Sequence, residues 1–194
     1  MDMPFDAAGA QSDEALLAAY GRGDAQAARA LTLRFTPRVL SHAARLLGDA
    51  AEAEDVAQEA MLRLWKIAPD WRAGEARVST WLFRVTGNLC TDRLRRRRGQ
   101  GLDGVPEPHD EAPGAEARLL SGQRAQALQE ALDALPVRQR QAVILRHIEG
   151  LSNPEIAQVM EIGTEAVESL TARGKRALKA ELAARRGELG LQDD

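Results

Sequence analysis

Cysteine, aromatic residues and long apolar runs are scarce in this sequence of 194 residues. Its single cysteine, Cys90, cannot form an internal disulfide, which favours a reducing compartment. No stretch approaches the roughly 18–20 apolar residues that a membrane span needs, and the acidic N-terminus lacks the apolar core of a signal peptide. We therefore expect a soluble cytoplasmic protein with no membrane insertion.

The residue patterns that accompany catalysis are also missing. The sequence has three histidines and one cysteine, without the spacing of metal ligands. It shows no Ser/His/Asp or Cys/His constellation and no glycine-rich phosphate loop. We therefore expect no catalytic residues, no metal and no cofactor, so an enzyme is improbable.

Basic residues are absent from 99–117, directly after the most basic part of the chain. Five of the six residues in 93–98 are arginine, and the segment 61–98 holds ten basic and three acidic residues. Residues 99–117 hold five acidic residues and none of the opposite sign. The net charge of −3 therefore hides a local cationic patch, which is the electrostatic requirement for binding nucleic acid.

Alternating strand patterns and hairpin dipeptides are missing as well, and the apolar residues recur at helical spacing. Val56, Ala60, Met61 and Leu64 form one such stripe. The sequence therefore predicts an all-α fold. The expected helices are 12–21, 24–47, 51–68, 79–97, 116–134, 137–148, 153–160 and 164–185.

A change of composition divides the chain into two parts. The segment "GQGLDGVPEPHDEAPGAE" is rich in glycine, proline and acidic residues, so it cannot build a core. We expect two small helical domains, residues 12–98 and 118–187, joined by a flexible acidic linker at 99–117.

The stretch "GLSNPEIAQVMEIGTEAVESLTARGKRAL" (150–178) predicts a helix-turn-helix. Ser152 and Glu155 have the spacing of a capping box, and "EIG" supplies the turn before a longer second helix. A capped helical hairpin also occurs in bundles that bind no DNA, but cations crowd one end of this second helix. The residues expected to face outward or to supply these cations are Glu165, Glu168, Ser169, Ala172, Arg173, Lys175, Arg176 and Lys179.

The stretch "STWLFRVTGNLCTDRLRRRR" (79–98) combines aromatic rings with cations. Trp81 and Phe83 can stack on unpaired bases, and Asn88 can form a hydrogen bond with a flipped base. The arginines Arg93, Arg95, Arg96, Arg97 and Arg98 can neutralise phosphates. A solvated charged face and a core position for Trp81 are the alternatives.

A third feature is the polar face of "EAEDVAQEAMLRLW" (52–65), where Asp55, Gln58 and Glu59 share one side of a helix. This face either docks a basic partner or is simply solvated, with Arg63 paired to Glu59. The spacing alone favours the solvated alternative.

These three segments, in this order, resemble the extracytoplasmic-function (ECF) sigma factors of bacterial RNA polymerase, from about Asp13 to Ala184. "EDVAQEAMLRLW" is similar to the region 2 helix, although Met61 stands where the family usually has phenylalanine. "STWLFRVTGNLCTDRLRRRR" is similar to the strand-separating segment that reads the minus-10 element. "LDALPVRQRQAVILRHIEGLSNPEIAQVMEIGTEAVESLTARGKRAL" is similar to region 4, which reads the minus-35 element.

The resemblance implies a role for each segment. Asp55, Gln58 and Glu59 would dock on the clamp helices of the largest polymerase subunit. Asn88 would start the loop that captures a flipped minus-10 base, with Trp81 and Phe83 near the melted strand. The minus-35 major groove would be faced by Thr164, Glu168, Ser169 and Arg173.

The resemblance further implies core RNA polymerase, promoter DNA and an anti-sigma factor as partners. The acidic linker would thread the RNA-exit channel of the polymerase. The chain departs from the family where Glu168 and Leu170 replace basic residues and Gly174 replaces alanine. Two other hypotheses remain: a helix-turn-helix regulator that binds DNA without polymerase, and a sigma mimic that only binds a partner.

Overall fold

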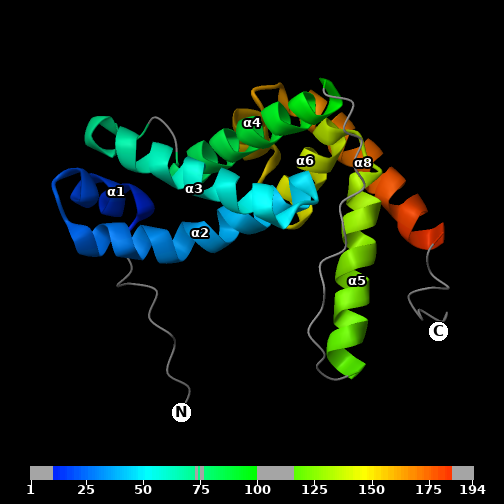
Figure 1. Cartoon of the computed structure of the whole chain (residues 1–194). Helices are drawn as coiled ribbons and strands as arrows, with labels where there is room; N and C mark the ends of the chain where they lie inside the picture. The colour runs from blue at the N-terminus through cyan, green and yellow to red at the C-terminus, as the bar shows by residue number, and fades with distance from the viewer. Residues whose placement is uncertain (1–10, 73, 75–76, 100–115, 185–194) are drawn as a thin grey trace, which may run out of the picture.

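The computed structural model describes residues 11–72, 74, 77–99 and 116–184. The first half of the chain forms α1 (Asp13–Gly21), α2 (Ala25–Leu47), α3 (Ala50–Ile67), a short 3-10 turn η2 (Ala68–Asp70) and α4 (Val78–Gly99). Figure 1 shows α2, α3 and α4 running beside one another, with α1 against one end of α2. These elements form the helical domain that carries the acidic face and the arginine run.

Local sequence signals set where the first three helices begin. Ser12 accepts a hydrogen bond from the backbone of α1, and Asp24 and Asp49 do the same for α2 and α3. Such side chains satisfy backbone N–H groups that have no partner inside the helix. Gly48 ends α2 in the left-handed region, with φ of 67°, and lets the chain turn directly into α3.

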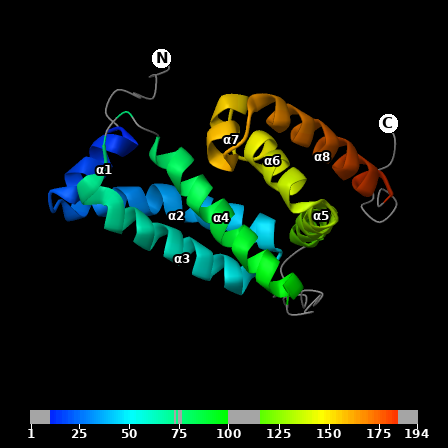
Figure 2. The same cartoon turned by 90° about the horizontal axis from the view of Figure 1, so that it is seen from above.

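The second half forms α5 (Glu116–Asp133), α6 (Val137–His147), α7 (Asn153–Met160) and α8 (Thr164–Ala184). In Figure 1, α5 extends away from the other helices, and Figure 2 shows it end-on beside α6 and α8. The end of α5 packs through its buried residues Ala131 and Leu132. Helices α7 and α8 are joined by a short turn at 161–163, in which Glu161 has a φ of 53°.

The two halves share apolar cores. One cluster joins Leu46 and Val56 of the first half to Leu132 and Ile144 of the second. A second cluster places Phe83 of α4 among apolar residues of α6, α7, α8 and the turn before α7, namely Leu145, Leu151, Ile156, Val159 and Val167. The structure is therefore a closed form, by which we mean that the helix-turn-helix half lies against the first half.

The structure confirms the all-α prediction, because no strand occurs within the described ranges. The predicted helix bounds agree with the observed ones to within two residues, the largest difference being the end of α4 at Gly99. Most of the predicted acidic linker, at 100–115, lies outside the described residues, while α4 and α5 extend into its two ends. No described helix is long and apolar enough to span a membrane.

Candidate docking surface and nucleic-acid interface

The polar face of α3 is at the surface, as its spacing predicts. The side chain of Asp55 is 69% exposed, and its Oδ2 lies 3.6 Å from Nη1 of Arg93. Gln58 is exposed, and Glu59 accepts a hydrogen bond of 2.8 Å from Nε of Arg63. Exposed pairs of this kind contribute about 0–1 kcal/mol each, so this face can exchange its present partners for those of another protein.

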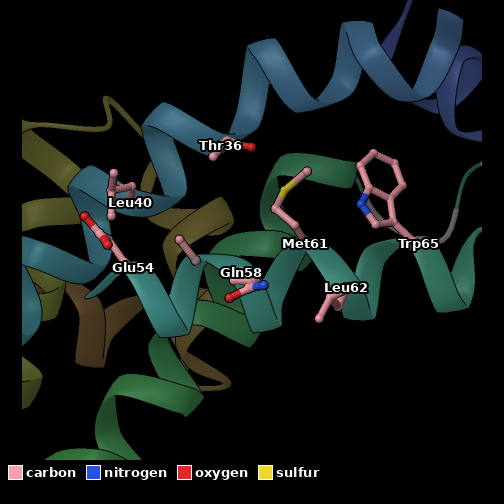
Figure 3. A pocket seen from close by; sticks show the side chains of 8 residues that line it. Thr36, Leu40, Glu54, Gln58, Met61, Leu62 and Trp65 are labelled. Atoms are coloured by element: carbon pink, nitrogen blue, oxygen red, sulfur yellow. The ribbon is translucent and has the colours of Figure 1, made fainter. Parts of the chain in front are cut away.

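An apolar groove adjoins this polar face, between α2 and α3. It has a volume of about 320 Å³ and is lined by Thr36, Leu40, Glu54, Ala57, Gln58, Met61, Leu62 and Trp65. Figure 3 shows Met61 and Trp65 pointing from α3 toward α2. Leu62 is 55% exposed at its edge. The sequence reasoning did not predict this groove, although the apolar Leu62 beside the polar face was a signal of it.

The three residues of α4 expected near a melted strand have different environments. Asn88 is exposed, but it lies in the middle of α4, so the expectation that a loop starts at Asn88 is wrong. Trp81 is half-buried and packs edge-on against Trp71, with ring centroids 6.2 Å apart. Phe83 is only 1% exposed, because the second half of the chain covers it.

The arginine run divides into exposed and engaged side chains. Arg96 and Arg98 are exposed, and Arg95 is exposed with an ion pair to Asp92 at 3.0 Å. Arg93 lies near Asp55 across α3 and α4.

Arg97 differs from its neighbours in the run. Its side chain is 27% exposed and lies 3.1 Å from Oδ2 of Asp49 and 3.0 Å from Oε1 of Glu52. It also donates a hydrogen bond of 3.2 Å to the carbonyl oxygen of Leu47. Arg97 therefore ties the end of α4 to the turn between α2 and α3.

Helix α8 presents its predicted DNA-facing residues to solvent. Its exposed side chains include Thr164, Glu165, Glu168, Ser169, Arg173, Lys175 and Arg176. Oε1 of Glu168 accepts a hydrogen bond of 3.3 Å from the side-chain amide of Asn153, the first residue of α7. The carboxylate of Glu168 is thus oriented by the neighbouring helix while remaining at the surface.

The position of α8 depends on a close approach to α6 at Gly174. A Cβ atom at this glycine would lie 2.6 Å from Cγ2 of Val143 and 3.1 Å from the carbonyl oxygen of Gln139. The glycine that departs from the family pattern is therefore required by packing in this chain. The capping box is also present: the backbone N–H and the hydroxyl of Ser152 donate to Oε2 of Glu155, at 2.8 and 2.7 Å.

A buried arginine joins the two halves, and sequence reasoning missed it. Arg140 of α6 is 6% exposed and donates a hydrogen bond of 2.7 Å to the carbonyl oxygen of Leu46, at the end of α2. The same guanidinium lies 2.6 Å from Oδ1 of Asp133. We call Arg140, Asp133 and the Leu46 carbonyl the latch.

Two buried titratable side chains near the boundary are held in their neutral forms. Burial and the nearby Arg45 lower the pKa of His42 to about 3, and its ring packs edge-on against Phe83. Burial raises the pKa of the Cys90 thiol to about 12. Neutral side chains at these positions suit a core and are unsuited to acid–base chemistry near neutral pH.

Comparison with known proteins identifies both halves of the chain. The family description "Sigma-70 region 2" matches residues 31–100, and "Sigma-70, region 4" matches residues 125–178. The ECF RNA polymerase sigma factor SigE of Mycolicibacterium smegmatis is 35% identical over 157 residues, which cover 79% of this chain and 60% of that protein. SigM of Mycobacterium tuberculosis is 36% identical over 169 residues, covering 87% of this chain and 83% of the relative.

Solved structures show the same fold. CnrH in complex with the cytosolic domain of CnrY has a TM-score of 0.65 at 27% identity, covering 90% of this chain and 99% of that one. The sigma factor RpoE of Bartonella quintana, in complex with the anti-sigma factor NepR, has a TM-score of 0.66 at 24% identity. The match covers 80% of this chain and 96% of that one. Region 2 and region 4 thus occur in one chain, in the order that the sequence motifs predicted. The chain belongs to the extracytoplasmic-function group of the sigma-70 family of RNA polymerase sigma factors.

Proposed function

We propose that this chain is an alternative sigma factor that binds core RNA polymerase and directs promoter recognition, DNA melting and transcription initiation. The observation that carries the proposal is the match to region 2 followed by region 4 within one chain. Relatives that align with 79% and 87% of the chain are named as ECF RNA polymerase sigma factors. The role is one of binding and positioning, without a catalytic step, and it belongs in the cytoplasm with the polymerase.

The docking surface for polymerase is the polar face of α3 together with the apolar groove beside it. Asp55, Gln58 and Glu59 offer carboxylate and amide oxygens to a basic partner. Gln58 also lines the groove, whereas Asp55 and Glu59 border a cleft between α3 and α4. A partner helix with cations on one edge and an apolar side chain on the other would match both features.

The minus-10 surface lies on α4. Asn88 supplies an exposed amide for a base edge, and the exposed Arg95, Arg96 and Arg98 track phosphates nearby. Arg93 can leave its weak pair with Asp55 to join them, whereas Arg97 is already held by two carboxylates. Trp81 is half-buried in the first turn of α4.

The minus-35 surface is the exposed side of α8. The capping box holds α7 in place, and Gly174 brings α8 close to α6, so the outer side of α8 is presented by a rigid support. The residues that contact the major groove or its phosphates are Thr164, Glu165, Glu168, Ser169, Arg173, Lys175 and Arg176.

Each predicted domain has its own binding partners. Residues 12–98 bind polymerase and the minus-10 element, residues 118–187 bind the minus-35 element, and the acidic linker at 99–117 lies in the RNA-exit channel. An anti-sigma factor is a further partner, because the similar structures of CnrH and RpoE are described as complexes, with the cytosolic domain of CnrY and the anti-sigma factor NepR.

Transcription in vitro from fragments of the source genome tests this function. Purified core polymerase should start transcripts at specific promoters only when this protein is added. A regulator that acts without polymerase would instead bind specific duplex DNA by itself. A sigma mimic would bind its partner and support no transcript, so either of these results would overturn the proposal.

A further inference from the structure

Three arginines of the first half lie at the boundary between the halves, and each is paired with a glutamate of the second half. The polarity is the same in every pair, with the cation on the first half and the carboxylate on the second. The pairs are Arg38 with Glu149 at 3.6 Å, Arg77 with Glu155 at 2.8 Å, and Arg84 with Glu161 at 3.7 Å. The first half therefore presents a row of three cations, each paired with a carboxylate of the second half.

An aromatic ring lies within this row. The guanidinium carbon of Arg38 is 5.2 Å from the centroid of the Phe83 ring, and Arg84 is the next residue along α4. Apolar side chains of the second half, including Leu145 and Ile156, bury this ring almost completely. If the second half moved away, the first half would expose an aromatic side chain flanked by cations.

This combination has the chemistry of a single-strand binding surface. Aromatic rings stack on bases, and cations beside them neutralise the phosphates that link those bases. The three glutamates frame α7: Glu149 precedes it, Glu155 is in its first turn and Glu161 follows it. Their carboxylates occupy the positions beside the arginines where phosphates would be bound.

The pairs themselves are weak enough to be exchanged. Arg77 is largely exposed, and a polar cleft of about 1060 Å³ opens beside Arg77 and Glu155. The exposed pairs Arg77–Glu155 and Arg84–Glu161 contribute about 0–1 kcal/mol each, whereas the carboxylate of Glu149 is 7% exposed beside Arg38. The buried apolar contacts and the latch therefore hold the halves together. A polyanion can therefore compete for these cations.

We propose that Arg38, Arg77 and Arg84, together with Phe83, form a binding surface for single-stranded DNA that α7 and its flanking glutamates mask in the closed form. The inference rests on the proposed function in one respect, because it takes α4 as the helix that contacts the melted strand. It adds a row of phosphate contacts outside the arginine run of 93–98. It also means that strand binding and the closed form exclude each other.

Binding of a fluorescent oligothymidylate to the whole free protein tests both parts of the proposal. The variant E149Q/E161Q removes two masking charges and leaves Glu155 in its capping box. It should bind about fivefold more tightly than the wild type, which corresponds to about 1 kcal/mol, because the strand then has no carboxylate to displace from Arg38 or Arg84. The variant R38Q/R84Q should bind more weakly, with a log–log salt slope shallower by about 1.4 for two lost phosphate contacts.

Matched controls separate these effects from general electrostatics and from unfolding. D70N/E181Q changes the net charge by the same amount as E149Q/E161Q, at two carboxylates without an ion pair in the described part of the chain. R38K/R84K keeps both charges and should keep the wild-type salt slope. Thermal melting of each variant shows whether it is folded.

Each outcome bears on the proposal. If E149Q/E161Q binds no more tightly than the wild type, or no more tightly than D70N/E181Q, the masking is overturned. If R38Q/R84Q retains the wild-type slope while folded, the binding surface is overturned. The sigma function is judged separately, by transcription with wild-type protein and core polymerase, so its failure is distinguishable from the failure of this surface.

Discussion

At the scale of single residues, chemical type alone does not determine what a side chain does in this protein. Arg97 and Arg96 are adjacent arginines, yet Arg97 is held by Asp49 and Glu52 while Arg96 is exposed. Gly174 would be a weak point in an isolated helix, since glycine costs up to about 1 kcal/mol relative to alanine there. In the folded chain it permits the contact between α6 and α8. The neighbours of each residue determine its role.

Gly174→Ala should lower the melting temperature despite the better helix propensity of alanine. The added Cβ would meet Val143 at 2.6 Å and the backbone of Gln139 at 3.1 Å, and overpacking of this kind typically costs about 1–3 kcal/mol. Thermal denaturation checks the result. Gly99→Ala, where no atom lies within 4 Å of the new Cβ, should not destabilise the fold. Adding Val143→Ala to Gly174→Ala should cost less than the sum of the two single changes.

Glu168→Ala tests whether the least expected residue of α8 reads a base. A carboxylate is repelled by phosphates, but it can accept a hydrogen bond from cytosine N4, and such a contact is worth about 1–3 kcal/mol of discrimination. Transcription should lose selectivity at one minus-35 base pair, measured with all four bases at each position. The lost bond to Asn153 is exposed, so stability should change little. A uniform gain at every sequence would show that Glu168 only repels DNA.

At the scale of secondary-structure elements, single helices carry different functions on different sides. Helix α3 buries Val56, Ala60 and Leu64 in the core while its opposite side presents the docking surface. In helix α4, Leu82 and Cys90 are buried, Phe83 is covered by the second half of the chain, and Asn88 is exposed. The helical period of 3.6 residues separates these sides, so a surface substitution on one side leaves the core contacts of the other intact.

The double variant D55K/E59K should weaken binding to core polymerase by several kcal/mol, because both carboxylates would lose basic partners across a desolvated interface. Folding should change little, since Asp55 and Glu59 now make only exposed ion pairs with Arg93 and Arg63. Titration of labelled protein with core polymerase gives the affinity. D70K/E181K supplies a control with the same change of net charge. An unchanged affinity for D55K/E59K would leave the polar side of α3 as a solvated face.

At the scale of the whole molecule, the contact between the halves is the main feature that the helix predictions did not contain. Apolar side chains from both halves form common clusters, and the latch crosses from α6 to the end of α2. Gly87 of α4 also faces the side chain of Gln141 of α6 at a distance that leaves no room for a Cβ atom. The closed form is therefore closely packed, and its opening has an energetic cost that a partner must offset.

Arg140→Met tests the latch. The change leaves the Leu46 carbonyl and Asp133 without their charged donor, which should cost about 2–3 kcal/mol, because hydrogen bonds to charged groups are the stronger ones. Calorimetry should show a lower melting temperature and unfolding that separates into two transitions as the halves uncouple. Arg138→Met, an exposed change on the same helix, is the matched control. A single transition at the wild-type temperature would show that the latch does not couple the halves.

The sequence by itself determined the helices, their order and the family. Apolar periodicity, the caps at Asp24 and Asp49 and the capping box of Ser152 are local signals, each complete within a few residues, so they can be read before any folding is known. The exposed polar sides of α3 and α8 follow from the same periodicity, because the residues opposite an apolar stripe face water.

Only the tertiary structure decided which of the candidate residues are covered or engaged. Phe83 meets Leu145 and Ile156, and Arg140 meets Leu46, across more than 60 residues of chain. Burial is a property of all the segments that meet at one place, and a periodic pattern along one segment does not specify which distant segment covers it. For the same reason, no pattern along the sequence predicts that Arg38, Arg77 and Arg84 are paired with glutamates of the second half.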